Sequence, residues 1–268
     1  MPRGHLTNML APSPPIYRHP SASPAVRHAW VPVWDIPEGS SWPQRTLQYP
    51  HALIVVSSSY ARFYGVATGL SSVELSGRGW AFGVALQPSS GRPLLGRPMA
   101  ELVDSHLGLD RLSALDGAEL TAAIRGAMAD DPHDTEAHRS CLALVEAAVD
   151  AVVERDDEAD LVDAVCERVE TDPSLTRVSQ LCEGFGIAER RLQRLLHDRI
   201  GISPKWLIRR RRLQEAAHEL RTHPDQVLAG LAADLGYADQ AHFTRDFSSV
   251  VGMSPSGFRR AATTPRGT

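Results

Sequence analysis

The alternation of apolar and polar residues changes character near residue 98 of this 268-residue chain. Over about residues 30–95, short runs of β-branched and aromatic residues are separated by Gly, Ser and Pro, a pattern typical of strands and turns. From Pro98 onward, apolar residues recur at spacings of three and four in PMAELVDSHL, DGAELTAAIRGAMA and EAHRSCLALVEAAVDAVVER, which indicates amphipathic helices. The pattern therefore predicts a β-rich module followed by a series of helices.

Composition and breaks in this pattern divide the chain into five segments. The first residues are rich in Pro and Ser and lack the apolar stretch of a signal peptide, which predicts a disordered leader. Asp172-Pro173 marks a later boundary, because a residue before proline is pushed out of helical geometry. The predicted segments are a leader over 1–28, a β-rich sensing module over 29–110, a helical dimerisation or linker region over 111–171, an all-α domain over 172–262 and a tail over 263–268.

The all-α segment contains the same small motif twice. GIAERRLQRLLHDRIGISP has a counterpart about fifty residues later in GYADQAHFTRDFSSVVGMSP. In each copy a short helix, a glycine-containing turn and a second helix predict a helix-turn-helix unit. Ser203-Pro204 and Ser254-Pro255 then predict capped starts of further helices, because Ser is a preferred N-cap and Pro suits the first helical position.

The second helix of each unit carries an apolar stripe and a polar outward face. The side chains expected inside are Leu192, Leu195, Leu196 and Ile200 in the first unit, and Phe243 and Phe247 in the second. Because the second helix of such a unit enters the major groove of DNA, its outward residues are candidate base contacts. These are Arg190, Gln193 and Arg194 in the first unit, and Gln240, His242, Thr244 and Arg245 in the second. Arginine can bind guanine bidentately and glutamine can bind adenine, with phosphate contacts or solvated side chains as the alternatives.

Candidate contacts to the DNA backbone lie on or beside these helices. They are His197, Ser203, Arg209, Arg210 and Ser254. The four arginines that begin at Arg209 occupy successive positions of one helix and face all directions, so at most two can reach one phosphate backbone. Two recognition helices about one duplex turn (~34 Å) apart can read successive segments of the major groove.

Charge is distributed unevenly along the chain. The net charge is −4, yet the residues from Ser174 onward carry 15 Arg and Lys against 9 Asp and Glu, which gives +6. The remaining 13 basic and 23 acidic residues give −10 for residues 1–173. A basic C-terminal part on an acidic body suggests a polyanionic partner for that part, with a basic surface that binds nothing as the alternative.

Residues 174–262 resemble the DNA-binding domain of AraC-family transcription regulators. The resemblance is carried by the first repeat, by RLQEAAHEL, and by LAADLGYADQAHFTRDFSSVVGMSPSGFRR with its GY, DQAHF, R-x-F and G-x-S-P-x-x-F-R pattern. It implies a sequence-specific regulator of promoter DNA, and it allows RNA polymerase, a small-molecule effector and a homodimer as partners. The lack of a signal-peptide pattern and of a membrane-spanning run predicts a cytoplasmic location. It also assigns Arg212 to helix packing. The family commonly has Ser where this chain has Ala188, so the first recognition helix is expected to lack a cap worth about 1 kcal/mol.

The β-rich segment more loosely resembles the cupin-like N-terminal module of one AraC-family branch. The phrase GVALQPSSGRPLLGRPMAELVD carries this resemblance, which implies a small β-barrel or sandwich. The expected fold class is therefore α+β, with a β-rich, cupin-like N-terminal module and its helices followed by an all-α domain of two helix-turn-helix units.

Two enzyme classes are the alternatives, a cupin-like metal enzyme and a DNA-repair protein with zinc-held cysteines. The first 173 residues contain no His-x-His, and His51 and His106 alone do not supply three metal ligands. Cys141, Cys166 and Cys182 have no CxxC spacing and lie in helical patterns, where buried thiols are common. We therefore expect no catalytic residue, metal or cofactor. No apolar run approaches the ~18 residues of a spanning helix, so a membrane is not expected as a partner.

The helix predicted from Thr135 to about Arg155 is a candidate dimer surface. Its apolar face is broader than contact with one neighbouring sheet requires, and it consists of Leu142, Leu144, Val145, Ala148, Val149 and Val152. The alternative is that this face packs only within its own chain. Near the start of this helix, His133 and His138 lie beside aspartates and are expected to form a solvated junction between loop and helix.

Overall fold

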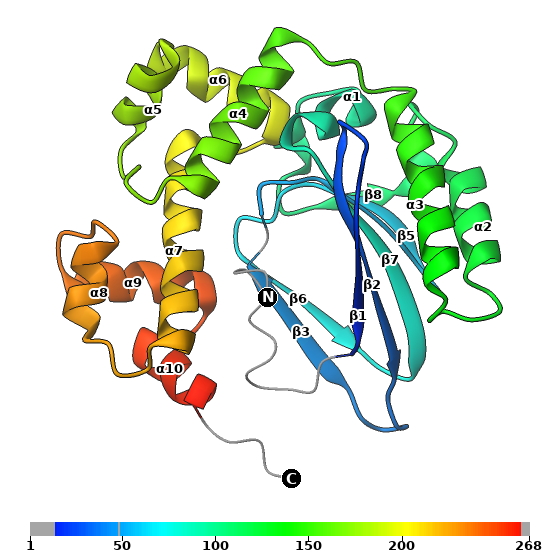
Figure 1. Cartoon of the computed structure of the whole chain (residues 1–268), viewed down its shortest axis with the longest axis horizontal. Helices are drawn as coiled ribbons and strands as arrows, with labels where there is room; N and C mark the ends of the chain where they lie inside the picture. The colour runs from blue at the N-terminus through cyan, green and yellow to red at the C-terminus, as the bar shows by residue number, and fades with distance from the viewer. Residues whose placement is uncertain (1–13, 48, 264–268) are drawn as a thin grey trace.

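The computed structural model describes residues 14–47 and 49–263 of the chain. Strands gather on one side of the molecule and most of the helices on the other, with the long helix α7 (Pro204–Thr222) between the two helix-turn-helix units (Figure 1). The predicted α+β class, with a β-rich module before an all-α part, is confirmed. Within the described residues, no helix is both long and apolar enough to cross a bilayer.

The main sheet is antiparallel and has six strands in the order β1-β2-β7-β4-β5-β8. These strands are β1 Ile16–Pro20, β2 Val26–Asp35, β7 Arg78–Leu86, β4 Leu53–Ser57, β5 Ala61–Tyr64 and β8 His106–Gly108. A separate two-stranded ribbon pairs β3 (Trp42–Leu47) with β6 (Leu70–Leu75). Because β1 and β8 lie at opposite edges, the strands described here form an open sheet with a ribbon, rather than the closed barrel that the cupin-like resemblance allowed.

The leader predicted over residues 1–28 is contradicted over its C-terminal part. Strand β1 begins at Ile16 and pairs with β2, whose residue Val26 lies in the core. The prediction was wrong for residues 16–28 because β1 is an edge strand with the sequence IYRHP, which carries few apolar side chains and ends at Pro20, where a ladder donor is dispensable. The disorder predicted for residues 1–13 and the tail from residue 264 lie outside the described residues.

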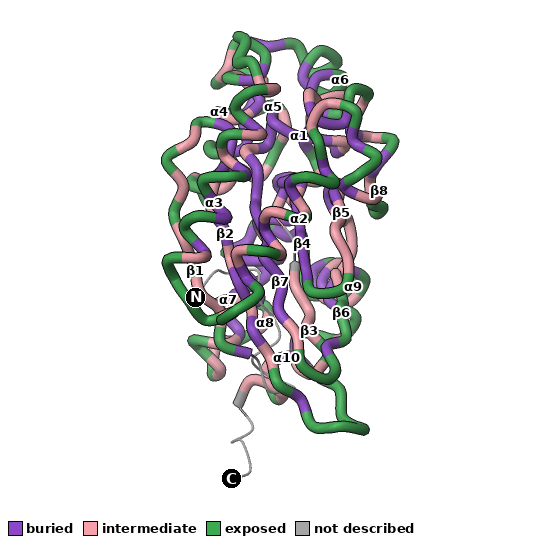
Figure 2. The backbone as a smooth tube through the Cα atoms, turned by 90° about the vertical axis from the view of Figure 1, so that its right-hand side faces the viewer, coloured by how far each residue is buried: buried purple, intermediate pink, exposed green. Residues whose placement is uncertain are grey.

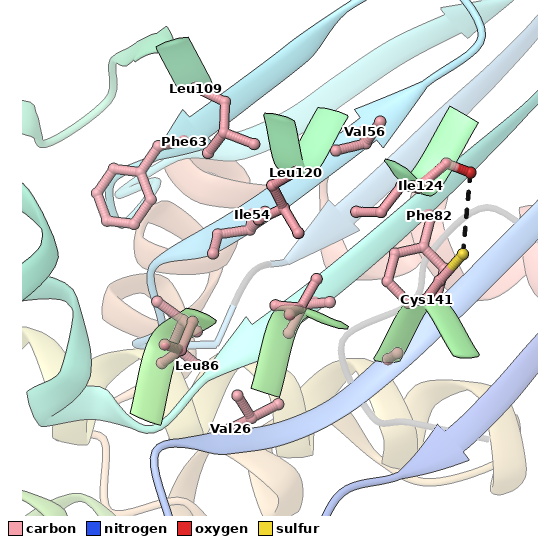
Figure 3. Close-up of a cluster of buried hydrophobic side chains, with 14 of the residues drawn as sticks. Val26, Ile54, Val56, Phe63, Phe82, Leu86, Leu109, Leu120, Ile124 and Cys141 are labelled. Carbon is pink, nitrogen blue, oxygen red and sulfur yellow. Dashed lines mark hydrogen bonds between the residues drawn. The ribbon is translucent and has the colours of Figure 1, made fainter. Parts of the chain in front are cut away.

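Two helices cover one face of the main sheet and close the first core. Helix α2 spans Gly117–Ala127 and α3 spans Thr135–Asp150. Figure 3 shows side chains from the strands and from both helices meeting in this core, among them Val26, Ile54, Val56, Phe63, Phe82, Leu86, Leu109, Leu120, Ile124 and Cys141. The core residues come from sequence positions more than a hundred residues apart, so the sheet and the two helices form one folding unit.

The thiols behave as structural groups. Cys141 is fully buried and its Sγ lies 3.9 Å from the Ile124 carbonyl oxygen, while burial raises the pKa of this thiol to about 11. Cys166 is also buried, and burial raises its pKa well above the usual value. Cys182 is partly exposed, and all three cysteines are free.

The apolar face of α3 is core and does not form a dimer surface. Leu142 is 6% exposed and Val145 and Val149 are fully buried, while Ala148 and Val152 pack against the same cluster. The proposed pairing through this face was therefore wrong, because four elements of the same chain pack against α3: helix α2 and strands β1, β2 and β7. Of the six residues, Leu144 alone is substantially exposed, at 41%.

The junction before α3 also differs from the expectation. His138 is fully buried, and its ring nitrogens face His19 Nε2 at 3.1 Å and the Pro132 carbonyl oxygen at 2.9 Å. His133 Nδ1 lies 2.8 Å from the Tyr17 hydroxyl. The solvated junction was wrong for His138, because β1, which was assigned to the leader, covers it.

The stretch PMAELVDSHL is not an amphipathic helix. It begins with one turn of 3-10 helix, η3 (Met99–Leu102), becomes extended, and then enters β8. Asp104 has φ 55°, a conformation that ends any helix and that few residues other than Gly adopt. The short α1 (Gly91–Leu95) and the 3-10 turn η2 (Pro88–Ser90) precede this stretch.

From Asp157 onward the described residues form seven helices. They are α4 Asp157–Thr171, α5 Val178–Phe185, α6 Glu189–Ile200, α7 Pro204–Thr222, α8 Leu228–Asp234, α9 Gln240–Val251 and α10 Pro255–Thr263. Helix α4 ends just before Asp172, as predicted. However, its buried face, which includes Val162 and Val165, belongs to the same apolar cluster as α5, α6 and α7. The boundary at residue 172 is thus the end of a helix and not the end of a core.

The two leucines of α3 provide a test of this assignment. Leu142→Ala is expected to lower the free energy of unfolding by about 2–5 kcal/mol, because it leaves a cavity in the core. The matched change Leu144→Ala, two residues away, should alter it by less than about 0.5 kcal/mol. Urea denaturation measures both, and equal losses would contradict the burial of this face.

Candidate DNA-binding surface

The first helix-turn-helix unit has the predicted form. Helix α5 ends at Gly186, which has φ 61°, and α6 begins at Glu189. The four apolar residues predicted to face inward on α6 are all buried. The residues predicted to face outward are all exposed, and they are Arg190, Gln193, Arg194 and His197. The predicted pattern of buried and exposed positions on α6 is therefore confirmed, while contact with DNA stays a prediction for each of these side chains.

The second unit repeats this arrangement. Gly236 has φ 73° at the end of α8, and the Asp239 side chain accepts a hydrogen bond of 2.6 Å from the His242 amide, which caps α9 as predicted. Phe243 and Phe247 are fully buried. Of the predicted base contacts, Gln240, His242 and Arg245 are exposed and Thr244 is partly buried.

The predicted serine caps follow each recognition helix. Ser203 Oγ accepts from the Trp206 amide at 3.1 Å and caps α7, while Ser254 Oγ accepts from the Gly257 amide at 3.2 Å near the start of α10. Both serines are exposed. Because helix N-termini present free amides and a positive dipole end, these two positions suit a DNA phosphate.

Both recognition helices lie toward the same side of the molecule. In Figure 2, α6 lies above α9, and the paired helices α5 and α8 lie nearer the middle of the view. In Figure 1 the same two units occupy the upper and lower left of the molecule, joined by α7. One face can therefore present both recognition helices.

The arginine run on α7 is used inside the protein. Arg210 is only 3% exposed, and its Nη2 donates to the Gly69 carbonyl oxygen at 3.1 Å. Burial lowers the pKa of this guanidinium to about 10. The prediction that Arg210 contacts the DNA backbone was therefore wrong, because the N-terminal module covers it. Arg211 is also buried and donates to the Leu175 carbonyl oxygen at 2.9 Å.

The other two arginines of the run hold α9 against α7. Arg209 Nε donates to Asp246 Oδ1 at 2.6 Å, and the Tyr237 hydroxyl donates to Asp246 Oδ2 at 2.8 Å. Arg212 lies over the Tyr237 ring at 3.7 Å, which confirms its packing role. Sequence reasoning missed Asp246, whose only signal was a carboxylate on an otherwise basic recognition helix. Arg209 remains partly exposed, so a phosphate contact would compete with this carboxylate.

Comparison with known proteins agrees with this geometry. Residues 181–261 match the model of a helix-turn-helix domain, and residues 17–108 match that of a domain of unknown function. An uncharacterized HTH-type transcriptional regulator of Haemophilus influenzae is 33% identical over 84 residues, which are 31% of this chain and 28% of that protein. The probable transcription factor PqrA of Proteus vulgaris is 32% identical over 89 residues, which are 33% of this chain and 72% of that protein. The chain belongs to the AraC family of helix-turn-helix transcriptional regulators.

Whole-chain relationships are more distant. The matched region spans 28% of the Haemophilus influenzae protein and 28% of the RhaS activator of Escherichia fergusonii, so most of each relative lies outside the match. Among solved structures, ToxT of Vibrio cholerae aligns over 93% of this chain and 97% of its own, with 14% identity and a TM-score of 0.39. The C-terminal domain of AraT from Geobacillus stearothermophilus covers 42% of this chain and 94% of its own, with 22% identity and a TM-score of 0.37.

In this AraC-family chain the first unit is anchored to the N-terminal half. Arg199, near the end of α6, pairs with Asp156 at 2.7 Å and with Glu158 at 3.4 Å, both at the start of α4. Asp198 pairs with Arg92 of α1 at 3.4 Å. Gly201 has φ 82° and packs so closely on η3 that a Cβ would lie 2.9 Å from the Met99 carbonyl oxygen. The end of α6 is thus clamped from two sides while its outward face stays open.

One polar contact on the outward face of α6 was also missed. Gln193 Nε2 donates to Glu189 Oε1 at 2.9 Å, so the amide proposed to read adenine is held by the first residue of its own helix. The i,i+4 spacing was the available signal. Glu189 also places an exposed carboxylate at the start of α6.

Ala188 gives α6 an uncapped start, as expected from the family comparison. It has the extended backbone of an N-cap, with φ −65° and ψ 138°, but no side-chain hydrogen bond caps the helix. Ala188→Ser is expected to raise the free energy of unfolding by about 1 kcal/mol, because it adds that bond. Ser203→Ala should lower it by a similar amount, about 1 kcal/mol, at the capped start of α7. Urea denaturation compares the two, and a destabilising Ala188→Ser would show that the first turn of α6 has no room for the cap.

Proposed function

We propose that this protein is a sequence-specific DNA-binding transcriptional regulator whose two helix-turn-helix units read successive segments of the major groove. The observation that carries the proposal is the pair of recognition helices on one side of the molecule, each with a buried apolar stripe and an exposed polar face. Membership of the AraC family and the +6 charge from Ser174 onward support a polyanionic partner.

The proposed base contacts are the exposed polar residues of α6 and α9. They are Arg190, Gln193 and Arg194 on α6, and Gln240, His242, Thr244 and Arg245 on α9. The proposed backbone contacts are His197, Ser203, Ser254 and, once released from Asp246, Arg209. Arginine and glutamine suit bidentate contacts with guanine and adenine, and capped helix starts suit phosphates.

The acidic N-terminal half is proposed to regulate this activity in response to an effector. Its support is physical continuity, because α4 and η3 are packed directly on the first unit. RNA polymerase and a second copy of the chain remain proposed partners. A homodimer would need a surface other than the buried face of α3.

The base-reading arginines can be separated from an arginine proposed to contact phosphate. Arg194→Ala and Arg245→Ala should each cost about 1–3 kcal/mol at particular base pairs and relax the preference there. Arg209→Ala should weaken binding to all sequences alike, and Arg139→Ala, an exposed arginine of α3, should change neither. Titration of an operator selected from random DNA, together with its single-base variants, measures each effect. A uniform loss in the Arg245 variant would assign that residue to phosphate.

The two-unit arrangement predicts the shape of the operator. Footprinting of the full chain should show two protected major-groove segments centred about 10 base pairs apart. The affinity should fall steeply as salt rises, because phosphate contacts release counterions. A single protected segment would contradict the proposal that both units contact the major groove. An affinity independent of salt would contradict the electrostatic role of the basic surface.

A further inference from the structure

A small cavity opens in the sheet module, beside the loop whose residue Gly69 contacts α7. It has a volume of about 250 Å³ and lies among β5, β6, β8 and the loops that join them. Its lining includes four side chains that can form hydrogen bonds, Tyr64, Ser71, Asp104 and Ser105, and the backbone of Gly69. Pockets for drug-sized ligands measure roughly 300–1,000 Å³, so this cavity suits a smaller molecule.

Asp104 has a left-handed backbone beside this cavity. Its φ of 55° is the one positive value among the described residues other than glycine, in a conformation that Asp and Asn adopt more readily than most side chains. Its carboxylate holds the loop between β5 and β6, because Oδ1 accepts from the Thr68 amide at 2.6 Å and Oδ2 accepts from the Thr68 hydroxyl. The Asp104 amide donates to the Val66 carbonyl oxygen at 3.0 Å, which ties the two loops together.

The same loop touches the second unit one residue further on. Gly69 accepts the hydrogen bond from buried Arg210 of α7, and Leu70 packs against the core that contains α8, α9 and α10. The Asp104 carboxylate also favours the charge of Arg210 electrostatically. Asp104 therefore acts on the second unit in two ways, through the position of the loop and through the charge that balances Arg210.

We propose that this cavity is the effector site of the protein and that it takes a small cationic amine, whose ammonium group pairs with Asp104 and competes with Thr68 for the carboxylate. The proposal rests on the proposed function and names its regulation. Asp104 is the sole carboxylate among the lining residues, and the Tyr64, Ser71 and Ser105 hydroxyls can accept or donate hydrogen bonds beside it. An anion would meet the Asp104 charge and is disfavoured.

Occupancy of the cavity acts on the second unit more than on the first. A cation beside Asp104 loosens the loop and weakens the balance of charge at Arg210, so the contact of the loop with α7 relaxes. The first unit also receives Val66 from this loop, but it is held in addition by the ion pairs of Arg199 and Asp198 and by the cluster shared with α4. The effector therefore changes the presentation of α9 more than that of α6.

Ligand binding is tested without DNA. Isothermal titration of the full chain with ethanolamine should show saturable binding, and Asp104→Asn should weaken it about tenfold, the loss expected for one charge-assisted hydrogen bond. Asparagine tolerates the left-handed conformation, so this variant should keep the fold. Glycerol and acetate serve as neutral and anionic probes. No saturable binding of ethanolamine, equal binding by the variant, or tighter binding of acetate would overturn the site.

The coupling is tested by footprinting on the selected operator. Asp104→Gly keeps the backbone conformation and removes the carboxylate, so it should reduce protection of the segment read by α9 at least threefold and reduce that of the segment read by α6 by less. Glu101→Gln is the control, because Glu101 lies nearby in η3 and pairs only with exposed Arg97 in the contacts described. Equal loss at both segments, or none, would overturn the coupling. If no variant and no parent protein binds DNA, the proposed function fails, while the titration still decides whether the cavity binds the amine.

Discussion

The apolar cluster that α4 shares with the first helix-turn-helix unit determines how the two halves of this protein are joined. Val162, Val165 and Val169 of α4 are buried against leucines of α6 and residues of α7, and Val66 reaches the same cluster from the sheet module. A core of this kind cannot be divided without exposing apolar surface to water, which costs about 25 cal/mol for each Å². The first unit is therefore part of the N-terminal half as much as of the DNA-binding half. A relative motion of the two halves would leave the first unit with the sheet module and would displace the second unit together with the part of α7 that packs on it.

The two helix-turn-helix units have the same local structure but different contacts with the rest of the chain. Their turns, caps and apolar stripes are nearly equivalent, with a left-handed glycine at Gly186 and at Gly236. Their surroundings differ: ion pairs and 3-10 turns clamp the end of α6, whereas α9 is held by Asp246 and Tyr237 against α7. The internal repeat therefore yields a first unit fixed to the sheet module and a second unit packed on the connecting helix α7, where Gly69 and Leu70 provide contacts from the sheet module.

The features predicted correctly from the sequence were those determined over a few residues. The period of α6, the Asp239 cap and the serine caps depend on neighbours within one or two turns, so the pattern of residues contained them. The burial of Arg210 depends on Gly69, which is 141 positions away, and nothing near the arginine run indicated it. Strand β1 was missed for the same reason, because its short polar sequence becomes a strand only beside β2. The elements that pack on the apolar face of α3 are also distant in the sequence. The outward residues of both recognition helices were located correctly, but their contacts with DNA depend on a partner that the chain alone does not contain.

The distribution of the three thiols has a practical consequence for measuring motion in this molecule. Thiol reagents attack the thiolate at an accessible sulfur, and Cys141 and Cys166 are buried with raised pKa values, so both react slowly. Cys182 lies in α5 near the turn that leads to α6; burial raises the pKa of its thiol too, but it is the one partly exposed cysteine of the three. At mildly alkaline pH a fluorophore would attach there first, without any engineered cysteine. The wild-type chain thus carries an attachment point in α5 of the first unit. The distance between a dye at this point and a dye on the operator could be followed in solution.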